Sequence, residues 1–340
     1  MNISFLHPTL RTIQKNAVSC CIFLFCLSLG LGMSASPTLL EAAQPQKKQS
    51  SKAGTTQQRK ASAKKKSRHA SKTAKKKAPV TIGNNYKGII LYDKDAQKIL
   101  FERRQDVEVP PASLTKILSM YVTFDAIRDK KLHLSSLVPI SAKAATTGGS
   151  RMGIHAGEMI PLRELLKGMA ICSGNDASVA VAEYVAGSEE EFVKLMNAKV
   201  AALGMKNSVF KNAHGLHVPG QHTTAADMLL LAQNYLQDYP ENIEQYHANK
   251  QYTYKGKTTR NANSLLGKYD GVNGLKTGYV AAAGYNLITT IKREDGNFIS
   301  VLLGAPTSKI REQEVAHLLD SHLPNPAPTS KKAQVIAQQK

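Results

Sequence analysis

Two β-hairpin patterns enclose a series of helical patterns, and this order constrains the fold more than any other feature of the sequence. Residues 87–104 contain two β-rich runs around the polar stretch KDAQ, which predicts a hairpin. Residues 284–306 contain a second pair of apolar runs, and we predict that this hairpin turns at Asp295-Gly296. Strands, helices and again strands predict an α+β domain in which both hairpins join one antiparallel sheet with helices on its faces.

Helical patterns fill the segment between the hairpins. From Leu114 onwards, apolar residues recur at the spacing i, i+3, i+4, i+7 and i+8, which is typical of an amphipathic helix. A second helix begins with Ser188 and Glu191 in the arrangement of a capping box and ends on Gly204. Other helices are predicted at residues 161–172, 176–187, 223–236 and 308–322.

The positive charge of the chain is concentrated outside this predicted domain. The net charge is +20, and residues 47–77 contribute +13 because they contain eleven lysines, two arginines and no acidic residue. Residues 78–323 carry only +3. Residues 37–82 have almost no large apolar side chains, so they cannot bury enough surface to offset their ordering entropy. We predict that they form a disordered linker and that residues 324–340 form a disordered tail.

The first 36 residues have the three parts of a secretory signal. Arg11 and Lys15 form a positive region, residues 17–31 are almost all apolar, and small residues follow. The apolar run is shorter than the ~20 residues that a membrane-spanning helix needs. A retained N-terminal anchor stays an alternative, because Pro37 would hinder cleavage just before it. We therefore predict an exported protein of the periplasm or cell envelope.

Export narrows the partners expected for the basic linker. Lysine-rich arms commonly bind nucleic acid, but we expect no nucleic acid as a partner of an exported protein. Adhesion to anionic wall polymer or membrane lipid fits the compartment better, and a solvated spacer is the alternative. Removal of the signal would leave Cys172 as the only one of the four cysteines, so we expect no intrachain disulfide and a small buried thiol at this position.

A serine and a lysine stand one helical turn apart in the stretch PPASLTKI. A serine hydroxyl is a poor nucleophile at neutral pH and needs a base beside it. Residues i and i+3 share one face of a helix, so Ser113 and Lys116 can point together. Burial or nearby positive charge lowers the pKa of a lysine, which allows its amine to take the serine proton. Alone this motif is a weak signal, because S-x-x-K occurs by chance in most long chains.

Two further motifs follow, 60 and 163 residues after the first serine. The stretch CSGND places Ser173 and Asn175 between two apolar helices, where a hydroxyl and an amide can relay a proton and hold a substrate amide. The stretch NGLKTGY places Lys276, Thr277 and Gly278 on an expected strand of the sheet. There the lysine adds positive charge, the threonine adds a hydroxyl, and the glycine lets a substrate backbone approach. Each motif alone is a weak signal. Three short motifs in this order, each in a suitable helix, turn or strand, are strong evidence.

The chain resembles the low-molecular-mass penicillin-binding proteins of the D-alanyl-D-alanine carboxypeptidase type. The three motifs occur together in penicillin-binding proteins, and the resemblance runs from about Tyr86 to Leu319 through TGGSRMGIHAGE, NAHGLHVPGQHTTAADM, AGYNL and SKIREQE. It implies a β-lactamase/DD-peptidase-like transpeptidase fold with a helical subdomain over residues 83–323. It also implies a serine peptidase that removes the terminal D-alanine from peptidoglycan stem peptides, is inhibited covalently by β-lactam antibiotics and needs no cofactor or metal.

The resemblance also implies roles for individual residues. Ser113 would be the acylated nucleophile and Lys116 its base. Ser173 and Asn175 would line the cleft and assist proton transfer. The backbone N–H groups of Ser113 and Tyr279 would form the oxyanion hole.

Recognition of the substrate's terminal carboxylate would involve a second group of residues. Lys276 and Thr277 would lie at this end of the substrate, beside Gly278. Arg311 matches a family arginine that helps to hold the carboxylate, and the fork of an arginine suits a carboxylate. Tyr279 stands where several relatives carry histidine, which leaves the substrate preference open.

Three other functions stay open at this stage. Larger family members have a second, β-rich domain and a C-terminal amphipathic helix, and only a short polar tail follows residue 323 here. Some short members cut peptide cross-links, so a DD-endopeptidase is one alternative. A β-lactamase on the same scaffold is another, although the glutamate-containing loop of class A enzymes is not evident. The third is a non-enzymatic wall-binding protein, which the intact motif set argues against.

Several other polar groups have simpler structural interpretations. His214, His217 and His222 could bind zinc, but the surrounding glycines and proline favour loop histidines that cap turns. Asp227 is interpreted as an acid in the first turn of a helix. The stretch TGGSRMG at residues 147–153 could cradle an anion through its N–H groups, but we favour a structural loop near the cleft.

Overall fold

A five-stranded antiparallel sheet forms the centre of the fold. The computed structural model describes residues 83–324, and the strand order in the sheet is β2-β1-β9-β8-β7. The strands are β1 (Gly88–Asp93), β2 (Lys98–Arg103), β7 (Val272–Val280), β8 (Gly284–Arg293) and β9 (Gly296–Ala305). The predicted N-terminal and C-terminal hairpins therefore pair with each other in one sheet, through β1 and β9.

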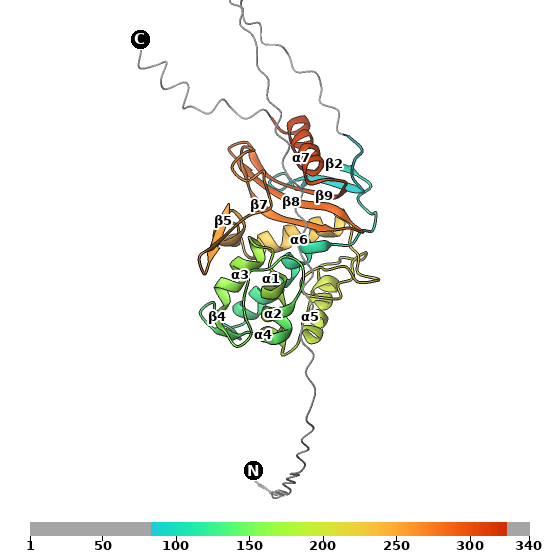
Figure 1. Cartoon of the computed structure of the whole chain (residues 1–340). Helices are drawn as coiled ribbons and strands as arrows, with labels where there is room; N and C mark the ends of the chain where they lie inside the picture. The colour runs from blue at the N-terminus through green and yellow to red at the C-terminus, as the bar shows by residue number, and fades with distance from the viewer. Residues whose placement is uncertain (1–82, 325–340) are drawn as a thin grey trace, which may run out of the picture. The chain divides into compact units, whose positions relative to one another are not determined.

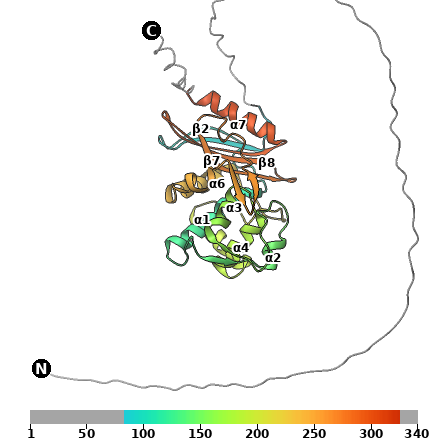
Figure 2. The same cartoon turned by 60° about the vertical axis from the view of Figure 1, so that its left-hand side comes forward.

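The sheet separates two hydrophobic cores. Ile288 and Val301 belong to the larger core, shared with the helices of one face. Leu287 and Leu302 belong to the smaller core, which α7 (Ser308–His322) completes on the other face. Figures 1 and 2 show α7 alone on its side of the sheet and the remaining helices on the opposite side. Alternate apolar side chains thus point to opposite faces of strands that are buried on both sides.

The helices on the larger side form a layer of their own, and α6 packs directly against the sheet (Figure 1). They are α1 (Thr115–Arg128), α2 (Ala142–Thr146), α3 (Leu162–Ala170), α4 (Asn175–Ala186), α5 (Glu189–Ala202) and α6 (Ala225–Asp238). Two small antiparallel sheets flank this layer. They are β3 (Leu137–Pro139) with β4 (Met159–Pro161), and β5 (Gln251–Tyr254) with β6 (Lys257–Arg260). A π-helical turn, η2 (Ile243–His247), follows α6.

The predicted helix ends agree with the observed caps. Ser188 Oγ accepts a hydrogen bond of 3.1 Å from the N–H of Glu191 at the start of α5, and Gly204 follows this helix with a φ of +74°. At the start of α6, Thr224 Oγ1 accepts from the N–H of Asp227 at 3.1 Å. These side chains satisfy N–H groups that have no partner inside the helix.

The turn of the C-terminal hairpin lies one residue earlier than predicted. Gly296 pairs with Arg293, so Glu294 and Asp295 are the two residues of the turn rather than Asp295 and Gly296. The Arg293 guanidinium contacts the Asp295 carboxylate at 2.9 and 3.0 Å, which fixes the acidic residue inside the turn. Gly296, with a φ of +140°, begins the next strand instead of completing the loop.

Several sequence-based predictions lie outside the described residues. These are the signal or anchor at residues 1–36, the basic linker at residues 37–82 and the tail at residues 324–340, of which only Pro324 is described. Within residues 83–324, no helix has both the length and the apolar character required to cross a membrane.

Candidate active site

Ser113 lies in a short 3₁₀ turn, η1 (Ala112–Leu114), that leads into α1. The preceding Ala112 has a φ of +50°, a region that non-glycine residues seldom occupy. Asn286 of β8 holds this segment, because its Nδ2 donates to the carbonyls of Pro110 and Pro111 at 3.2 and 3.3 Å. The strained turn is thus tied to the sheet and presents a half-buried serine at the helix start.

The Lys116 ammonium is fully buried and lies among three oxygen atoms. Its Nζ is 3.1 Å from Ser113 Oγ, 2.7 Å from Asn175 Oδ1 and 2.7 Å from the backbone carbonyl of His214. Burial lowers the pKa of Lys116 well below its usual value, and the positive charge of Lys276 lowers it further. The lysine therefore has access to its neutral form, which a general base requires.

The three partners fix the direction of the lysine's lone pair. A carbonyl oxygen and an amide oxygen are acceptors only, so each must receive an N–H from Lys116. A neutral amine has two N–H groups and one lone pair. When Asn175 and His214 take the two N–H groups, the lone pair faces Ser113 Oγ and can accept the serine proton. Helix spacing alone places Lys116 beside Ser113, and the contacts with Asn175 and His214 direct the lysine's lone pair towards the serine hydroxyl.

Asn175 is the first residue of α4, and the turn before it reaches across the site. Asn175 Nδ2 donates to the carbonyl of Gly148 at 2.7 Å, which leaves Oδ1 facing Lys116. Ser173 has a φ of +56°, and its hydroxyl is 3.0 Å from Lys276 Nζ. The S-x-N turn therefore contacts Lys116 through the amide of Asn175 and Lys276 through the hydroxyl of Ser173.

Lys276 lies on β7, an edge strand of the sheet, and its side chain is almost fully buried. Burial and the nearby charge of Arg311 lower the pKa of Lys276 to about 7. Its Nζ also donates to the carbonyl of Thr277 at 3.0 Å. Within the described chain, no acidic group forms an ion pair with Lys276. A buried cation without an anion is a favourable site for a substrate carboxylate.

The next two residues of β7 lie beside the serine. A Cβ atom on Gly278 would come within 3.1 Å of the backbone nitrogen of Ser113 and 3.2 Å of the carbonyl of Pro111, so only glycine fits without displacement. Tyr279 is 54% exposed, and its ring packs against Tyr285 with the centroids 4.3 Å apart and the planes tilted by 33°. The close approach of β7 places the strand that bears Tyr279 next to the turn that bears Ser113.

Arg311 is on α7, behind the sheet, and it affects the site through the positive charge of its guanidinium. Its side chain is buried, and its Nη2 donates to Glu312 Oε1 at 2.9 Å and to the carbonyl of Ala262 at 3.3 Å. Its Nε has no hydrogen-bond partner. The guanidinium is close enough to lower the pKa of Lys276. The structure therefore brings the predicted arginine near the K-T-G strand, without a direct hydrogen bond to its residues.

A buried carboxylate that the sequence interpretation left out organises the loop in front of Asn175. Asp176 accepts backbone N–H groups from Met152 at 2.9 Å and from Gly153 at 2.8 Å, and Ile154 N lies 3.4 Å away. The stretch TGGSRMG thus binds an anion through its N–H groups, and the anion is the chain's own Asp176. Its favoured interpretation as a structural loop is correct.

We expect Asp176→Ala to lower the free energy of unfolding by about 2–4 kcal/mol, because it leaves several buried N–H groups without an acceptor. For a domain of this size, this loss lowers Tm by about 5 °C or more. Asp129→Ala is the control, since this carboxylate is 46% exposed and forms surface ion pairs worth ~1 kcal/mol or less. Thermal unfolding followed by circular dichroism measures both. Equal Tm values for the two variants would contradict the structural role of Asp176.

His214, Asp227 and Cys172 have the structural roles that were favoured. His214 Nδ1 accepts from the N–H of Leu216 at 3.1 Å and caps a turn. Asp227 Oδ2 accepts from the hydroxyl of Ser208 at 2.7 Å, and the backbone N–H of Asp227 donates to the cap residue Thr224 at 3.1 Å. Cys172 is a buried free thiol, and burial raises its pKa. Among residues 83–324, no cluster of three or more histidine, cysteine or acidic side chains is arranged to hold a metal ion.

The fold and this site together define the class of penicillin-interacting serine enzymes, in which a serine–lysine pair faces an S-x-N turn and a K-T-G strand. More narrowly, the chain belongs to the D-alanyl-D-alanine carboxypeptidase family of peptidases, whose model matches residues 72–307.

Curated relatives agree with this assignment. The chain is 41% identical over 237 residues to D-alanyl-D-alanine carboxypeptidase DacC of Escherichia coli, covering 68% of this chain and 59% of that protein. It is 38% identical over 244 residues to DacF of Bacillus subtilis, covering 70% and 62%. The chain therefore matches about three fifths of the length of these relatives.

Solved structures show the same fold. Penicillin binding protein 5 of Haemophilus influenzae is 34% identical and superposes with a TM-score of 0.68 over 72% of this chain and 71% of that chain. A penicillin-binding protein of Listeria monocytogenes, solved in an ampicillin-bound form, is 27% identical with a TM-score of 0.62 over 71% and 98%. The predicted DD-peptidase-like α+β fold is confirmed.

Proposed function

We propose that this protein is a serine-type D-Ala-D-Ala carboxypeptidase that removes the terminal D-alanine from peptidoglycan stem peptides. The observation that carries the proposal is the position of Lys116 Nζ, held by Asn175 Oδ1 and the His214 carbonyl at 2.7 Å each and facing Ser113 Oγ at 3.1 Å. Family membership and the names of the relatives support it. The catalytic domain is proposed to span residues 83–323.

In the proposed acylation step, Ser113 Oγ attacks the carbonyl carbon of the penultimate D-alanine while neutral Lys116 takes the hydroxyl proton. Negative charge then develops on the carbonyl oxygen, and the N–H groups of Ser113 and Tyr279 are proposed to stabilise it. The C–N bond breaks, and the leaving amine of D-alanine receives the proton that Lys116 took from Ser113, relayed through the hydroxyl of Ser173. Water releases the shortened peptide from Ser113 in a second step.

Substrate recognition is proposed to depend on the positive charges of Lys276 on the K-T-G strand and of Arg311 behind it. The terminal carboxylate would lie against Lys276 and Thr277, with the charge of Arg311 close by. This carboxylate would supply the anion that Lys276 lacks in the described chain. A β-lactam carries a carboxylate in a comparable place, so we expect penicillin to acylate Ser113 and to act as a covalent inhibitor.

A DD-endopeptidase is the second candidate. The chain is also 31% identical over 222 residues to a D-alanyl-D-alanine endopeptidase of Pseudomonas aeruginosa, covering 62% of this chain and 69% of that protein. Both reactions use the same acyl-enzyme and differ only in whether the leaving amine is free D-alanine or a cross-linked side chain. The higher identity to the two carboxypeptidases favours release of D-alanine.

Three substrates given to the purified chain test the proposal. A soluble pentapeptide ending in D-Ala-D-Ala should lose one alanine, a cross-linked dimer should be cut much more slowly, and penicillin should form an adduct that hydrolyses slowly. Mass spectrometry of the products measures all three. Faster cleavage of the dimer would establish the endopeptidase instead, and rapid turnover of penicillin would establish the β-lactamase.

The proposed place of action is the periplasm or cell envelope, with the lysine-rich segment adhering to anionic wall polymer or membrane. Deleting residues 47–77 should leave kcat/KM on a small soluble peptide unchanged, because the site lies within residues 83–324. It should weaken pelleting with cell walls or anionic vesicles. The binding of the full chain should decline as salt rises, because charges further apart than ~10 Å are screened at 0.1 M.

A variant with every lysine of residues 47–77 changed to glutamine is the matched control, since it keeps the length of the segment and removes most of its charge. It should pellet as weakly as the deletion. A tenfold fall of kcat/KM in the deletion would show that this segment belongs to the site. Pelleting unaffected by deletion, substitution and salt would leave the segment as a spacer.

A further inference from the structure

The backbone carbonyl of His214 is a direct partner of Lys116, so whatever fixes this carbonyl also fixes the lysine. The His214 carbonyl belongs to a loop in which several neighbouring backbone groups each have a side-chain hydrogen-bond partner. The carbonyl of Ala213 accepts from Ser119 Oγ of α1 at 2.7 Å. The N–H of Gly215 donates to Asn212 Oδ1 at 2.6 Å. These bonds tie the loop to α1 on one side and to itself on the other.

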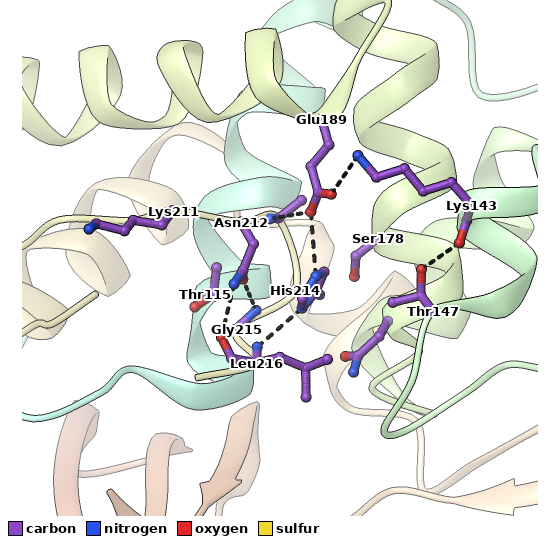
Figure 3. A network of polar contacts seen from close by, with 12 residues as sticks. Thr115, Lys143, Thr147, Ser178, Glu189, Lys211, Asn212, His214, Gly215 and Leu216 are labelled. Carbon is purple, nitrogen blue, oxygen red and sulfur yellow. Dashed lines mark hydrogen bonds and ion pairs between the residues drawn. The ribbon is translucent and has the colours of Figure 1, made fainter. Parts of the chain in front are cut away.

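Glu189, the first residue of α5, holds the same loop from the opposite side (Figure 3). Its Oε1 accepts from the N–H of Ala213 at 3.1 Å and lies 3.4 Å from His214 Nε2. Its Oε2 is 3.2 Å from Lys143 Nζ. Glu189 Oε1 thus contacts both the backbone N–H of Ala213, the residue before His214, and the imidazole ring of His214.

The hydrogen bonds of the ring assign its proton. Leu216 N–H donates to Nδ1 of His214, so Nδ1 is an acceptor, and the proton of the neutral ring is on Nε2, facing Glu189. Burial lowers the pKa of His214 to about 4, against the opposing effect of Glu189, so the ring is neutral at neutral pH. Glu189 Oε1 therefore accepts the N–H of Ala213 at 3.1 Å and lies 3.4 Å from the protonated Nε2 of the adjacent His214.

We propose that Glu189 is a positioning residue for Lys116, acting through the Ala213–His214 main chain, and that its acceptor oxygen rather than its charge performs this role. The inference rests on the proposed function of Ser113 and Lys116. If the His214 carbonyl moves, one N–H of the neutral lysine loses its acceptor, and the lone pair is no longer directed at Ser113 Oγ. Loss of Glu189 should therefore slow acylation without weakening the initial binding of the substrate.

The surroundings of Glu189 make this testable without loss of the fold. It lies in the wall of an open surface pocket of about 620 Å³, together with Lys143 and Glu190. Water can therefore fill the space that a smaller side chain leaves. Glu190 is the matched control, because it also contacts Lys143, at 3.0 Å, but is 71% exposed and has no contact with the His214 loop.

Stopped-flow measurements with a fluorescent penicillin separate the dissociation constant of the initial complex from the first-order rate of acylation. Glu189→Ala should lower the acylation rate about tenfold or more, since small misplacements of a reacting group cost this much. The dissociation constant should stay within about twofold. Glu189→Gln keeps an acceptor oxygen at the same place and should restore most of the rate. Glu190→Ala should change neither quantity.

The result that would overturn the inference is an acylation rate for Glu189→Ala equal to that of the unaltered chain, or Glu189→Gln as slow as Glu189→Ala. In the second case the charge and not the acceptor would matter. A larger change in the dissociation constant than in the acylation rate would also contradict it. If the unaltered chain is not acylated at all, the proposed function fails instead, so the two failures are distinguishable.

Discussion

Ser113→Ala should form no covalent adduct with penicillin and should release D-alanine roughly 10⁴-fold more slowly or worse, because the oxygen that forms the acyl bond is absent. The fold should be unaffected, since Ser113 is half-buried and its hydroxyl contacts only the Lys116 ammonium among the described residues. Intact-mass spectrometry should show one bound penicillin per unaltered chain and none per variant.

Ser150→Ala is a suitable control. Ser150 is exposed, and its contact with Asn175 is made by the backbone carbonyl of Ser150, which the substitution keeps. Its labelling should equal that of the unaltered chain. An adduct that persists in Ser113→Ala would place the nucleophile at another residue and would remove the basis of the proposed mechanism.

The second large effect is expected for Lys116→Ala, which should slow acylation by ~10²–10⁴-fold, the usual cost of losing a positioned base. Among the described residues, Lys116 Nζ is the only basic group within hydrogen-bond distance of Ser113 Oγ. Lys116→Met should behave in the same way, and it fills the buried volume of the lysine stem better. Acylation of both variants by penicillin is measured after circular dichroism has established that they are folded.

Loss of the ammonium also leaves Asn175 Oδ1 and the His214 carbonyl without their donor, so a lower Tm is expected in both lysine variants. The kinetic result is therefore interpreted only below that Tm. Near-normal acylation in a folded Lys116 variant would remove the lysine from the mechanism and would also remove the reason for the proposed role of Glu189.

Much of the fold was predictable from the sequence because apolar periodicity and capping residues are local signals. The hairpin at residues 87–104, the helix at residues 308–322 and the cap at Ser188 were all confirmed. The small sheets β3–β4 and β5–β6 were not predicted, because their strands have only three or four residues. Such short strands show no periodicity that separates them from loops.

The candidate site was predictable where it rests on side chains in short motifs. Helix geometry alone brings Lys116 to Ser113, and the motif order indicated Ser173, Asn175 and Lys276 as their neighbours. The contact between Lys116 and Asn175 joins residues 59 apart, and no local rule gives its direction.

Other parts of the site leave little trace in the sequence. The His214 carbonyl has no residue signature, because every residue carries a backbone carbonyl. Glu189 and Asn286 act through backbone groups, so their residue types point to no particular partner. Only the packing of α5 and β8 against the serine and lysine segments reveals them.

The most direct test of the account is to identify the acylated residue in the unaltered chain. After brief exposure to penicillin, tryptic digestion should yield the peptide of residues 105–116, in which Ser113 and Thr115 carry the only hydroxyl groups. Tandem mass spectrometry of this peptide should place the whole mass of one penicillin on Ser113. A modification on Ser173 or on any residue other than Ser113 would contradict the proposed mechanism, whatever the overall activity of the chain.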